Sequence, residues 1–394
     1  MERREALITG LVLLGLCLGV AALFSVARSG PSDVALLGSN SEDPPPRAID
    51  ATSEFDAFVS EAIAFVEATR GRRFVHDPVV TVLSEAQFVA RIRADLSAGF
   101  EEEPDDVDMF NAIYRSTGLI GVNDSIDDVY RQFGEAGILG FYDPLTDELV
   151  VRQRDELSLL TKSTIVHELT HAFDDQHFEL DRPHYEDRAD EVAWGFRAVA
   201  EGSASWVEAE WESTLTASDQ NALLREEQDF GDPGIFDQFQ FSFLLLELSP
   251  YQYGEPFVDH LVAGGGTDAL DEALEDPPIT SEQVIDPTRY DVGEGPIDLA
   301  PPPADGDIEF SGIGGQVLID SMFMGNGVNR GFEWGGDLLV VWTADSLSCL
   351  RWDIQAENGS TSHVIDDFEA WGARVGRTNV FATDDRTVRV ERCV

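Results

Sequence analysis

Two histidines and a glutamate stand close together in the segment STIVHELTHAFDDQH, which covers residues 163–177 and contains His167, Glu168 and His171. On a helix, residues four apart lie on one face, so both imidazoles can point at a single ion. Imidazole is a common ligand of Zn²⁺, and Glu168 would lie beside the ion, within reach of a water that the ion activates. The pattern therefore predicts a zinc site with Glu168 as general base.

A catalytic zinc site needs a third protein ligand and one open position. Glu201 follows in the run AVAEGSAS, on a segment with a helical pattern over 187–211, and the small residues around it allow close approach to a metal. The alternatives are His177, six residues after His171, and Asp174, one helical turn after it. The spacing of His177 fits a longer zinc motif that has a flexible glycine at position 174, where this chain has aspartate. We therefore expect Glu201 as the third ligand.

Several elements must bring these side chains together. The motif segment itself predicts a mostly apolar, buried helix over 161–176. Directly upstream, GILGFYDPLTDELVVR over 137–152 has two apolar runs around a turn sequence and predicts a β-hairpin. The other expected elements are helices over 53–70, 84–94, 107–117, 125–134, 187–211, 226–248 and 368–375, and strands over 79–83, 338–342 and 388–390. Together they predict an α+β fold that is mainly helical, with a small N-terminal sheet.

An uncharged stretch of 21 residues covers 6–26 and is long enough to span a bilayer. Arg3 and Arg4 precede it and the flank after Arg28 is acidic, so the positive-inside rule places the N-terminus in the cytoplasm. Small residues over 25–27 also fit cleavage by a signal peptidase. We expect a single-pass protein of the cell membrane with its catalytic domain outside, or a secreted protein if the segment is cleaved.

Composition and pattern divide the chain into five parts. They are a transmembrane signal anchor or signal peptide over 1–27, a disordered linker over 28–50, a catalytic domain over 51–275, a Pro-, Gly- and Asp-rich loop over 276–307, and an α/β segment over 308–394 that packs on the catalytic domain.

The charge is strongly acidic, with 75 Asp and Glu against 26 Lys and Arg and a formal net charge of −49. Phosphates would be repelled over most of the surface, which excludes nucleic acid as a partner. The acidic residues are spread along the chain, which favours adaptation to high salt over a docking site for a cationic partner.

Cysteine usage fits a location outside the cytoplasm. Cys17 lies in the apolar stretch and is expected to be a buried thiol. The remaining two, Cys349 and Cys393, are either a disulfide or two separate buried thiols, and an oxidising compartment favours the disulfide.

The chain resembles the glutamate-zincin tribe of metallopeptidases (gluzincins) in His167, Glu168, His171 and the later Glu201. It is more closely similar to a family of uncharacterised, predicted metalloproteases of bacteria and archaea. The resemblance covers most of the chain after the linker, and its specific part is HELTHAFDDQHFEL over 167–180. The shorter matching runs are RG at 70–71, GFYDP at 140–144, AEG at 200–202, PY at 250–251, PPITSEQ at 277–283 and WGGD at 334–337.

The resemblance implies one Zn²⁺ ion, a peptide or protein substrate, and a hairpin that presents an edge strand to the substrate. Phe141 and Tyr142 would then lie near the cleft, or else serve as ordinary sheet residues. Tyr251 would donate a hydrogen bond to the developing oxyanion, with Tyr253 and His260 as alternatives.

Two further positions belong to the resemblance but are not expected to take part in the reaction. Ser205 stands where several such peptidases keep an acid that holds a histidine, and the run 334–337 is expected to be a tight turn. The expected function is a membrane-anchored, outward-facing zinc metallopeptidase. The alternatives are a catalytically silent metal-binding scaffold and a zinc hydrolase of a non-peptide amide.

Overall fold

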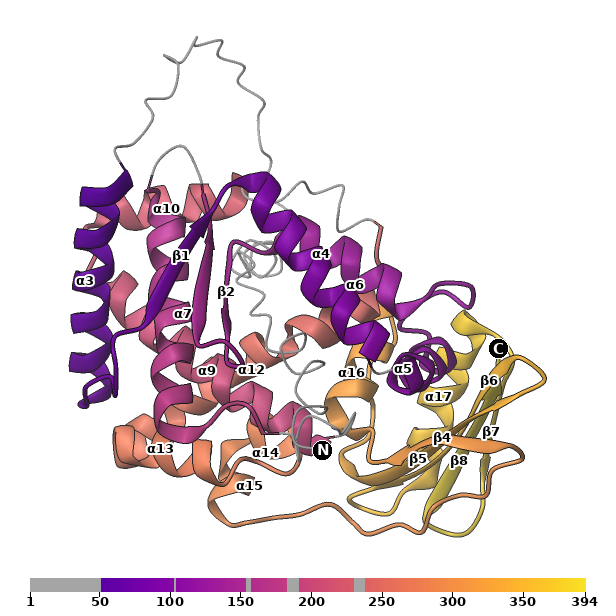
Figure 1. The fold of residues 1–394 in the computed structure, drawn as a ribbon. Coiled ribbons are helices and arrows are strands. Elements are labelled where there is room, and N and C mark those ends of the chain that lie inside the picture. Colours follow the sequence, from indigo (N-terminus) through magenta and orange to yellow (C-terminus); the bar gives the residue numbers. More distant parts are fainter. Residues whose placement is uncertain (1–50, 103, 154–156, 183–190, 230–237) are drawn as a thin grey trace, which may run out of the picture.

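The computed structural model describes residues 51–394, except 103, 154–156, 183–190 and 230–237 (Figure 1). The expected anchor over 1–27 and linker over 28–50 lie outside the described residues. Within the described part, no helix combines the length and the apolar character that crossing a membrane requires. The fold is mixed α+β with two small sheets, as expected from the sequence.

The N-terminal sheet has three strands, β1 (Val79–Leu83), β2 (Gly140–Asp143) and β3 (Glu148–Arg152), in the order β1-β3-β2. β2 and β3 form the expected antiparallel hairpin, and β1 runs parallel to β3. β2 therefore lies at an edge of the sheet. The helices before the hairpin are α3 (Ala51–Arg70), α4 (Glu85–Glu102), α5 (Pro104–Thr117) and α6 (Ile126–Gly137).

The helices after the hairpin carry the motif. They are α7 (Leu159–Phe178), α9 (Glu191–Ser213), α10 (Ala217–Asp229), α12 (Phe241–Gly265) and α13 (Thr267–Glu275). The helix expected over 226–248 is wrong as one element, because α10 ends at Asp229 and α12 begins only at Phe241. Residues 238–240, directly before α12, are described and are not helical.

α9 and α12 cross at unusually close range. A Cβ atom on Gly202 would lie 2.4 Å from the backbone of Gly254, and one on Gly254 would lie 2.1 Å from the carbonyl oxygen of Ala198. Neither distance is compatible with a side chain. The two glycines therefore let the backbones of α9 and α12 touch, and this contact places α12 beside the residues of α7 and α9 that form the candidate site.

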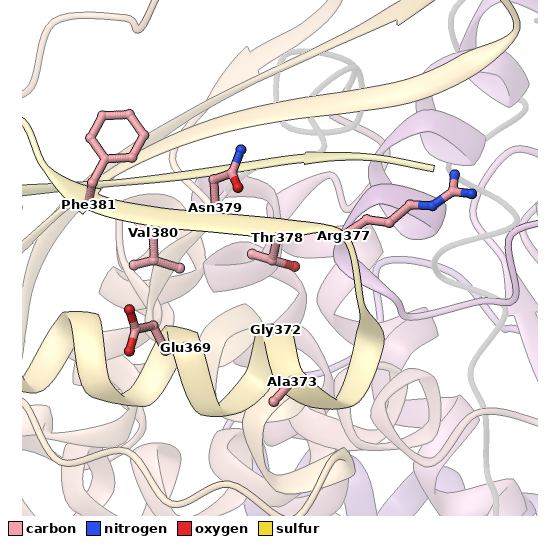
Figure 2. Close-up of a pocket in the computed structure, with 8 residues that line it drawn as sticks. All are labelled: Glu369, Gly372, Ala373, Arg377, Thr378, Asn379, Val380 and Phe381. Atoms are coloured by element: carbon pink, nitrogen blue, oxygen red, sulfur yellow. The ribbon is translucent and has the colours of Figure 1, made fainter.

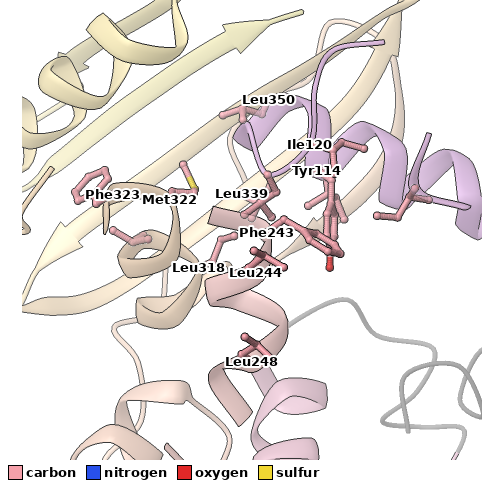
Figure 3. Close-up of a cluster of buried hydrophobic side chains, with 14 of the residues drawn as sticks. Tyr114, Ile120, Phe243, Leu244, Leu248, Leu318, Met322, Phe323, Leu339 and Leu350 are labelled. Carbon is pink, nitrogen blue, oxygen red and sulfur yellow. The ribbon is translucent and has the colours of Figure 1, made fainter. Parts of the chain in front are cut away.

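The C-terminal part holds an antiparallel sheet in the order β4-β5-β6-β8-β7. Its elements are β4 (Asp307–Gly312), α16 (Gly315–Gly325), β5 (Trp334–Ala344), β6 (Leu347–Ala356), α17 (Thr361–Val375), β7 (Thr378–Ala382) and β8 (Thr387–Cys393). One buried cluster joins this sheet to the helices. Figure 3 shows its residues Phe243 and Leu248 of α12 with Leu318 of α16 and Leu339 of β5. The sheet and the N-terminal half of α12 thus share one core.

The segment 276–307, expected to be a loop, contains two short helices, α14 (Ser281–Ile285) and α15 (Pro287–Asp291). Each begins at a side chain that caps it, because Thr280 accepts a hydrogen bond from the backbone N–H of Gln283 and Asp286 accepts one from Thr288. The expectation was wrong for these residues. The Pro, Asp and Gly content of the segment is typical of a loop, and the capping residues cannot be distinguished from loop residues by composition. Residues 292–306 hold no helix or strand.

A disulfide joins Cys349 of β6 to Cys393 of β8, with the two Cα atoms 4.1 Å apart. The two cysteines are direct partners in the register of these antiparallel strands. The pairing favoured by the sequence is therefore present, and it crosslinks the strand that ends the chain to the centre of the sheet.

Candidate metal centre

α7 forms because its ends are capped and its sides are covered. Ser158 accepts a hydrogen bond from the backbone N–H of Thr161 at the start, and Glu179 adopts a left-handed conformation at the end. Most residues between are buried, including His167, Glu168 and His171. The two imidazole rings lie on one face with their centroids 4.9 Å apart. A rigid, covered helix therefore holds both histidines in one direction.

α9 packs against α7 and adds Glu201 to the histidine pair. Glu201 Oε2 lies 3.3 Å from His167 Nε2 and 3.2 Å from His171 Nε2. One ligand atom from each of the three residues lies within 4.8 Å of the others, and all three residues are buried. This group could bind a metal ion. Among the described residues, no other cluster of three or more His, Cys, Asp or Glu side chains could do so.

The chemistry of the group fits a metal. Two imidazole nitrogens and one carboxylate are the ligand set of many catalytic zinc sites. Glu201 Oε1 is buried and forms no hydrogen bond with any described residue, and His171 Nε2, also buried, has only the contact with Glu201 Oε2 at 3.2 Å, whose geometry is not that of a hydrogen bond. Such atoms are costly to bury without a partner, and an ion between them would supply one. Burial alone would raise the pKa of Glu201, but His171 and His167 lower it overall, so the Glu201 side chain stays anionic, as a metal ligand must be.

A second carboxylate, that of Glu208, contacts His167 through the ring nitrogen that does not face Glu201. His167 Nδ1 lies 2.9 Å from Glu208 Oε2, and the hydroxyl of Ser163 lies 2.7 Å from Glu208 Oε1. With Nδ1 donating to Glu208, the lone pair of Nε2 points toward Glu201, in the direction that a metal bound to this group would require. Glu208 thus makes the contact with a histidine that the resemblance placed at position 205, where this chain has serine. Its signal in the sequence is its position two helical turns after Glu201, on the same face of α9.

The acidic environment extends outward from Glu208. Glu212, one turn further along α9, lies 2.6 Å from the Ser163 hydroxyl, which has one proton for two carboxylates. Burial and then the charge of Glu208 raise the pKa of Glu212 to about 8. Burial also raises the pKa of Glu227 to about 7, again with Glu208 as the next cause. Part of this cluster is therefore protonated near neutral pH.

Glu168, the expected general base, lies where the hairpin meets α7. The residue is fully buried. A Cβ atom on Gly140 of β2 would lie 3.6 Å from Glu168 Cγ and 3.0 Å from Thr164 Cγ2. The edge strand therefore passes directly beside the base, and a glycine at position 140 makes room for this approach.

Tyr251 approaches the candidate site from α12. Its ring stacks on His167 with centroids 6.0 Å apart and an interplanar angle of 27°. Pro250 before it cannot donate to the helix, and the freed carbonyl of Leu246 instead accepts the hydroxyl of Ser249 at 2.6 Å. The two other candidates lie elsewhere. Burial and then the charge of Asp320 of α16 raise the pKa of Tyr253. His260 Nε2 pairs with Asp291 at 2.9 Å.

The alternative third ligands are not part of the group. His177 Nε2 lies 2.9 Å from the carbonyl oxygen of Arg73. Asp174 accepts the hydroxyl of Ser203 at 2.5 Å and pairs with Arg70, whose guanidinium is fully buried, at 3.1 Å. Arg70 also pairs with Asp271 at 2.7 Å. This buried network joins the ends of α3 and α7 to α9 and α13, next to His171 and Glu201.

The remaining residues that the resemblance singled out are structural. Phe141 is buried against Phe88, and the Tyr142 hydroxyl lies 2.8 Å from Asp147 and 2.7 Å from Asp175. Both therefore act as sheet residues that fix the hairpin. The expectation of a tight turn over 334–337 was wrong, because these residues are the first four of β5 and pair with β6. Asp337, the last of the four, is buried. It accepts hydrogen bonds from the indoles of Trp334 and Trp352 and from the backbone of Gly314 and Gly315.

A separate groove of about 640 Å³ lies between α17 and β7 (Figure 2). Glu369, Gly372 and Ala373 line it on the helix side, and residues 377–381 line it on the strand side. It contains none of the predicted site residues.

Comparison with known proteins gives little. No protein-family model matches this chain, and no curated protein matches it. Among solved structures, the crystal structure of "a putative hydrolase with a novel fold" from Chloroflexus aurantiacus is similar, with 11% sequence identity and a TM-score of 0.37. The match covers 73% of this chain and 97% of that chain. This likeness is too slight to carry an argument about function.

Proposed function

We propose that this chain is a zinc-dependent peptidase of the gluzincin type. The observation that carries the proposal is the buried group of His167, His171 and Glu201, whose ligand atoms lie within 4.8 Å of one another. Glu168 adjoins this group in the same buried helix. Zinc held there would polarise a peptide carbonyl and make water a stronger acid.

The residues of the chain supply the other parts of the reaction. Glu168 accepts a proton from the attacking water and can return it to the leaving amine. The hydroxyl of Tyr251, on the ring that stacks on His167, donates to the oxygen that gains negative charge. Glu208 holds the Nδ1 proton of His167 and keeps the ring oriented. The edge strand β2, next to Glu168, offers backbone groups to an extended peptide.

The proposal includes a location. The uncharged stretch over 6–26 would anchor the chain in the cell membrane, with the catalytic domain outside the cytoplasm. The disulfide between Cys349 and Cys393 supports an oxidising compartment. The net charge of −49 supports a working environment of high salt. The partners are a peptide or protein substrate and the membrane.

The test compares the full chain with its Glu168→Gln variant in molar salt, by metal content and by hydrolysis of a peptide library. Both should bind about one zinc ion, and the variant should lose roughly 10²–10⁴-fold in hydrolysis rate. Zinc binding without hydrolysis of any peptide would reject the peptidase. Hydrolysis of cell-wall or other non-peptide amides would then identify an amidase, and no hydrolysis at all would identify a silent scaffold.

A further inference from the structure

Arg197 places a positive charge next to the candidate metal centre. It precedes Glu201 by one helical turn, so both side chains lie on one face of α9. Its side chain is 12% exposed and therefore mostly buried. In a chain with only 26 basic residues and a net charge of −49, this is an uncommon position for an arginine.

The guanidinium of Arg197 is only loosely bound by the protein. Nη1 lies 3.5 Å from Glu247 Oε2, and Nη2 lies 3.5 Å from the backbone carbonyl oxygen of Glu247. Both distances are at the outer limit of a hydrogen bond. Nε forms no hydrogen bond with any described residue. A guanidinium has five N–H donors, so most of them are not used by these contacts.

Glu247, in contrast, is well satisfied without Arg197. Its Oε1 accepts the hydroxyls of Tyr130 at 2.9 Å and Tyr114 at 3.1 Å. Burial and the charge of Glu247 raise the pKa of both phenols, so both stay protonated and donate. The hydrogen bonds from the tyrosines hold Glu247 in place, and its two long contacts with Arg197 leave most of the guanidinium donors unused.

Arg197 also interacts electrostatically with residues of the candidate site. Burial alone would lower its pKa, but Glu247, Tyr251 and Glu201 raise the pKa overall. Two of these three groups belong to the proposed reaction centre. Arg197 therefore stays a cation that interacts electrostatically with Tyr251 and Glu201.

We infer that Arg197 is a specificity-determining residue that receives a carboxylate of the substrate, an inference that rests on the proposed peptidase function. The planar fork of an arginine matches the two oxygens of a carboxylate. An anionic peptide is repelled by most of this surface, and a cation beside the site offsets the repulsion locally. The carboxylate can come from the C-terminus of a peptide or from an Asp or Glu side chain.

The experiment uses three peptides of one sequence with the full-length chain in molar salt. The first ends in a free carboxylate, the second in an amide, and the third ends in an amide but carries an internal glutamate. The wild type should favour a carboxylate over the neutral amide by about 10- to 100-fold in kcat/KM, chiefly through KM. Preference for the first peptide would identify the C-terminus as the source, and preference for the third would identify a side chain.

Variants link this preference to Arg197. Arg197→Gln should bring the ratio of kcat/KM between the carboxylate and the neutral peptide close to one, whatever its effect on the rate with the neutral peptide, and Arg197→Lys should keep part of the preference. Arg289→Gln is the matched control, because Arg289 also pairs with several carboxylates but lies outside the site. It should keep the full preference. Equal losses on all three peptides in a folded Arg197→Gln variant, or equal rates in the wild type, would overturn the inference.

Binding separates this inference from the proposed function. The Glu168→Gln variant should bind the favoured carboxylate peptide more tightly than the amide, whether or not the wild type hydrolyses peptides. Loss of hydrolysis with this binding difference intact would reject only the peptidase. Hydrolysis without any binding difference would reject only the role of Arg197. The wild-type and Arg197→Lys measurements decide the matter if Arg197→Gln does not fold.

Discussion

His167 and Glu208 share a hydrogen bond of 2.9 Å between Nδ1 and Oε2, and this bond determines which nitrogen of His167 faces Glu201. A carboxylate behind a metal-binding histidine fixes the tautomer and raises the basicity of the ring. Glu208 lies 41 residues after His167, on a different helix. The orientation of His167 therefore depends on how α9 packs on α7.

Removal of Glu208 should weaken metal binding. Glu208→Ala leaves the Nδ1 proton of His167 without its acceptor, and we expect a loss of about 10- to 100-fold in zinc affinity. Glu208→Gln keeps an acceptor and should lose less. Zinc affinity is measured by competition with a chromophoric chelator. Glu210→Gln serves as control, since Glu210 is an exposed acid on the same helix and should not alter the affinity. Unchanged binding in Glu208→Ala would show that His167 is held by other contacts.

The ligand set is tested by a pair of variants. Glu201→Ala should lose most bound zinc because it removes the carboxylate from the group of three. His177→Ala should retain zinc, because His177 contacts the carbonyl oxygen of Arg73. Both are measured as metal per chain after dialysis, with thermal unfolding as a check on folding. A His177→Ala variant without zinc would mean that His177 reaches the ion.

Stability should fall as the pH rises through the titration of Glu212. Its folded pKa is about 8, above the unfolded value of about 4.3, so the folded chain holds a proton that the unfolded chain releases. The contribution is complete below about pH 4 and is lost up to pH 8, with a slope of at most about 1.4 kcal/mol per pH unit. Glu212→Gln removes this titration. The variant should therefore gain thermal stability relative to wild type between pH 5 and 9, and a constant difference across that range would contradict the buried proton.

The disulfide should stabilise the C-terminal sheet. Cys349 and Cys393 are 44 residues apart, and closure of a loop of this length contributes about 4 kcal/mol in the chain-entropy model. The Cys349→Ser, Cys393→Ser double variant should unfold at lower denaturant concentration than the oxidised wild type. Reduced wild type is the control and should match the variant. Two free thiols in the unreduced, unfolded protein would remove the basis for this prediction.

Salt should stabilise the protein. With a net charge of −49 the surface repels itself, and molar salt shortens the Debye length to about 3 Å. Melting temperature and peptide hydrolysis should both rise from 0.1 M to molar NaCl or KCl, with little difference between the two cations. Excluded salts such as sulfate would add stability through the hydrophobic effect, so the chlorides are the cleaner comparison. A flat curve would favour a cationic partner for the acidic surface.

Local patterns predicted the elements of the site well. The strand over 79–83, the hairpin within 137–152 and the motif helix were all readable, because apolar spacing and turn residues act within a few positions. The pairing of β1 with β3 was not readable. It joins Val79 to Glu148 across the α4, α5 and α6 helices, and no local pattern encodes a contact at that distance.

The same limit applies to the candidate site. The spacing of His167 and His171 sufficed for the pair, since one helix holds both. The resemblance placed the acid that holds a histidine at position 205, one turn after Glu201, whereas in the structure Glu208, two turns after Glu201, contacts His167. Which turn of α9 meets His167 depends on the packing of α9 on α7, and therefore on tertiary contacts. Arg197 was missed for the same reason, because its neighbours Glu247 and Tyr251 come from α12.

The contact between Gly202 and Gly254 has a consequence for tracing the ancestry of this chain. His-Glu-x-x-His is a short pattern that arises by chance in unrelated proteins, so it is a poor guide to descent. Two glycines on separate helices that must both lack a side chain are a joint constraint, because a substitution at either one would push the backbones apart. Genuine homologues of this fold should keep both glycines even where the surface and the C-terminal sheet have diverged. A search that demands the motif, Glu201-Gly202 and a glycine three residues after Tyr251 would therefore separate them from coincidental matches.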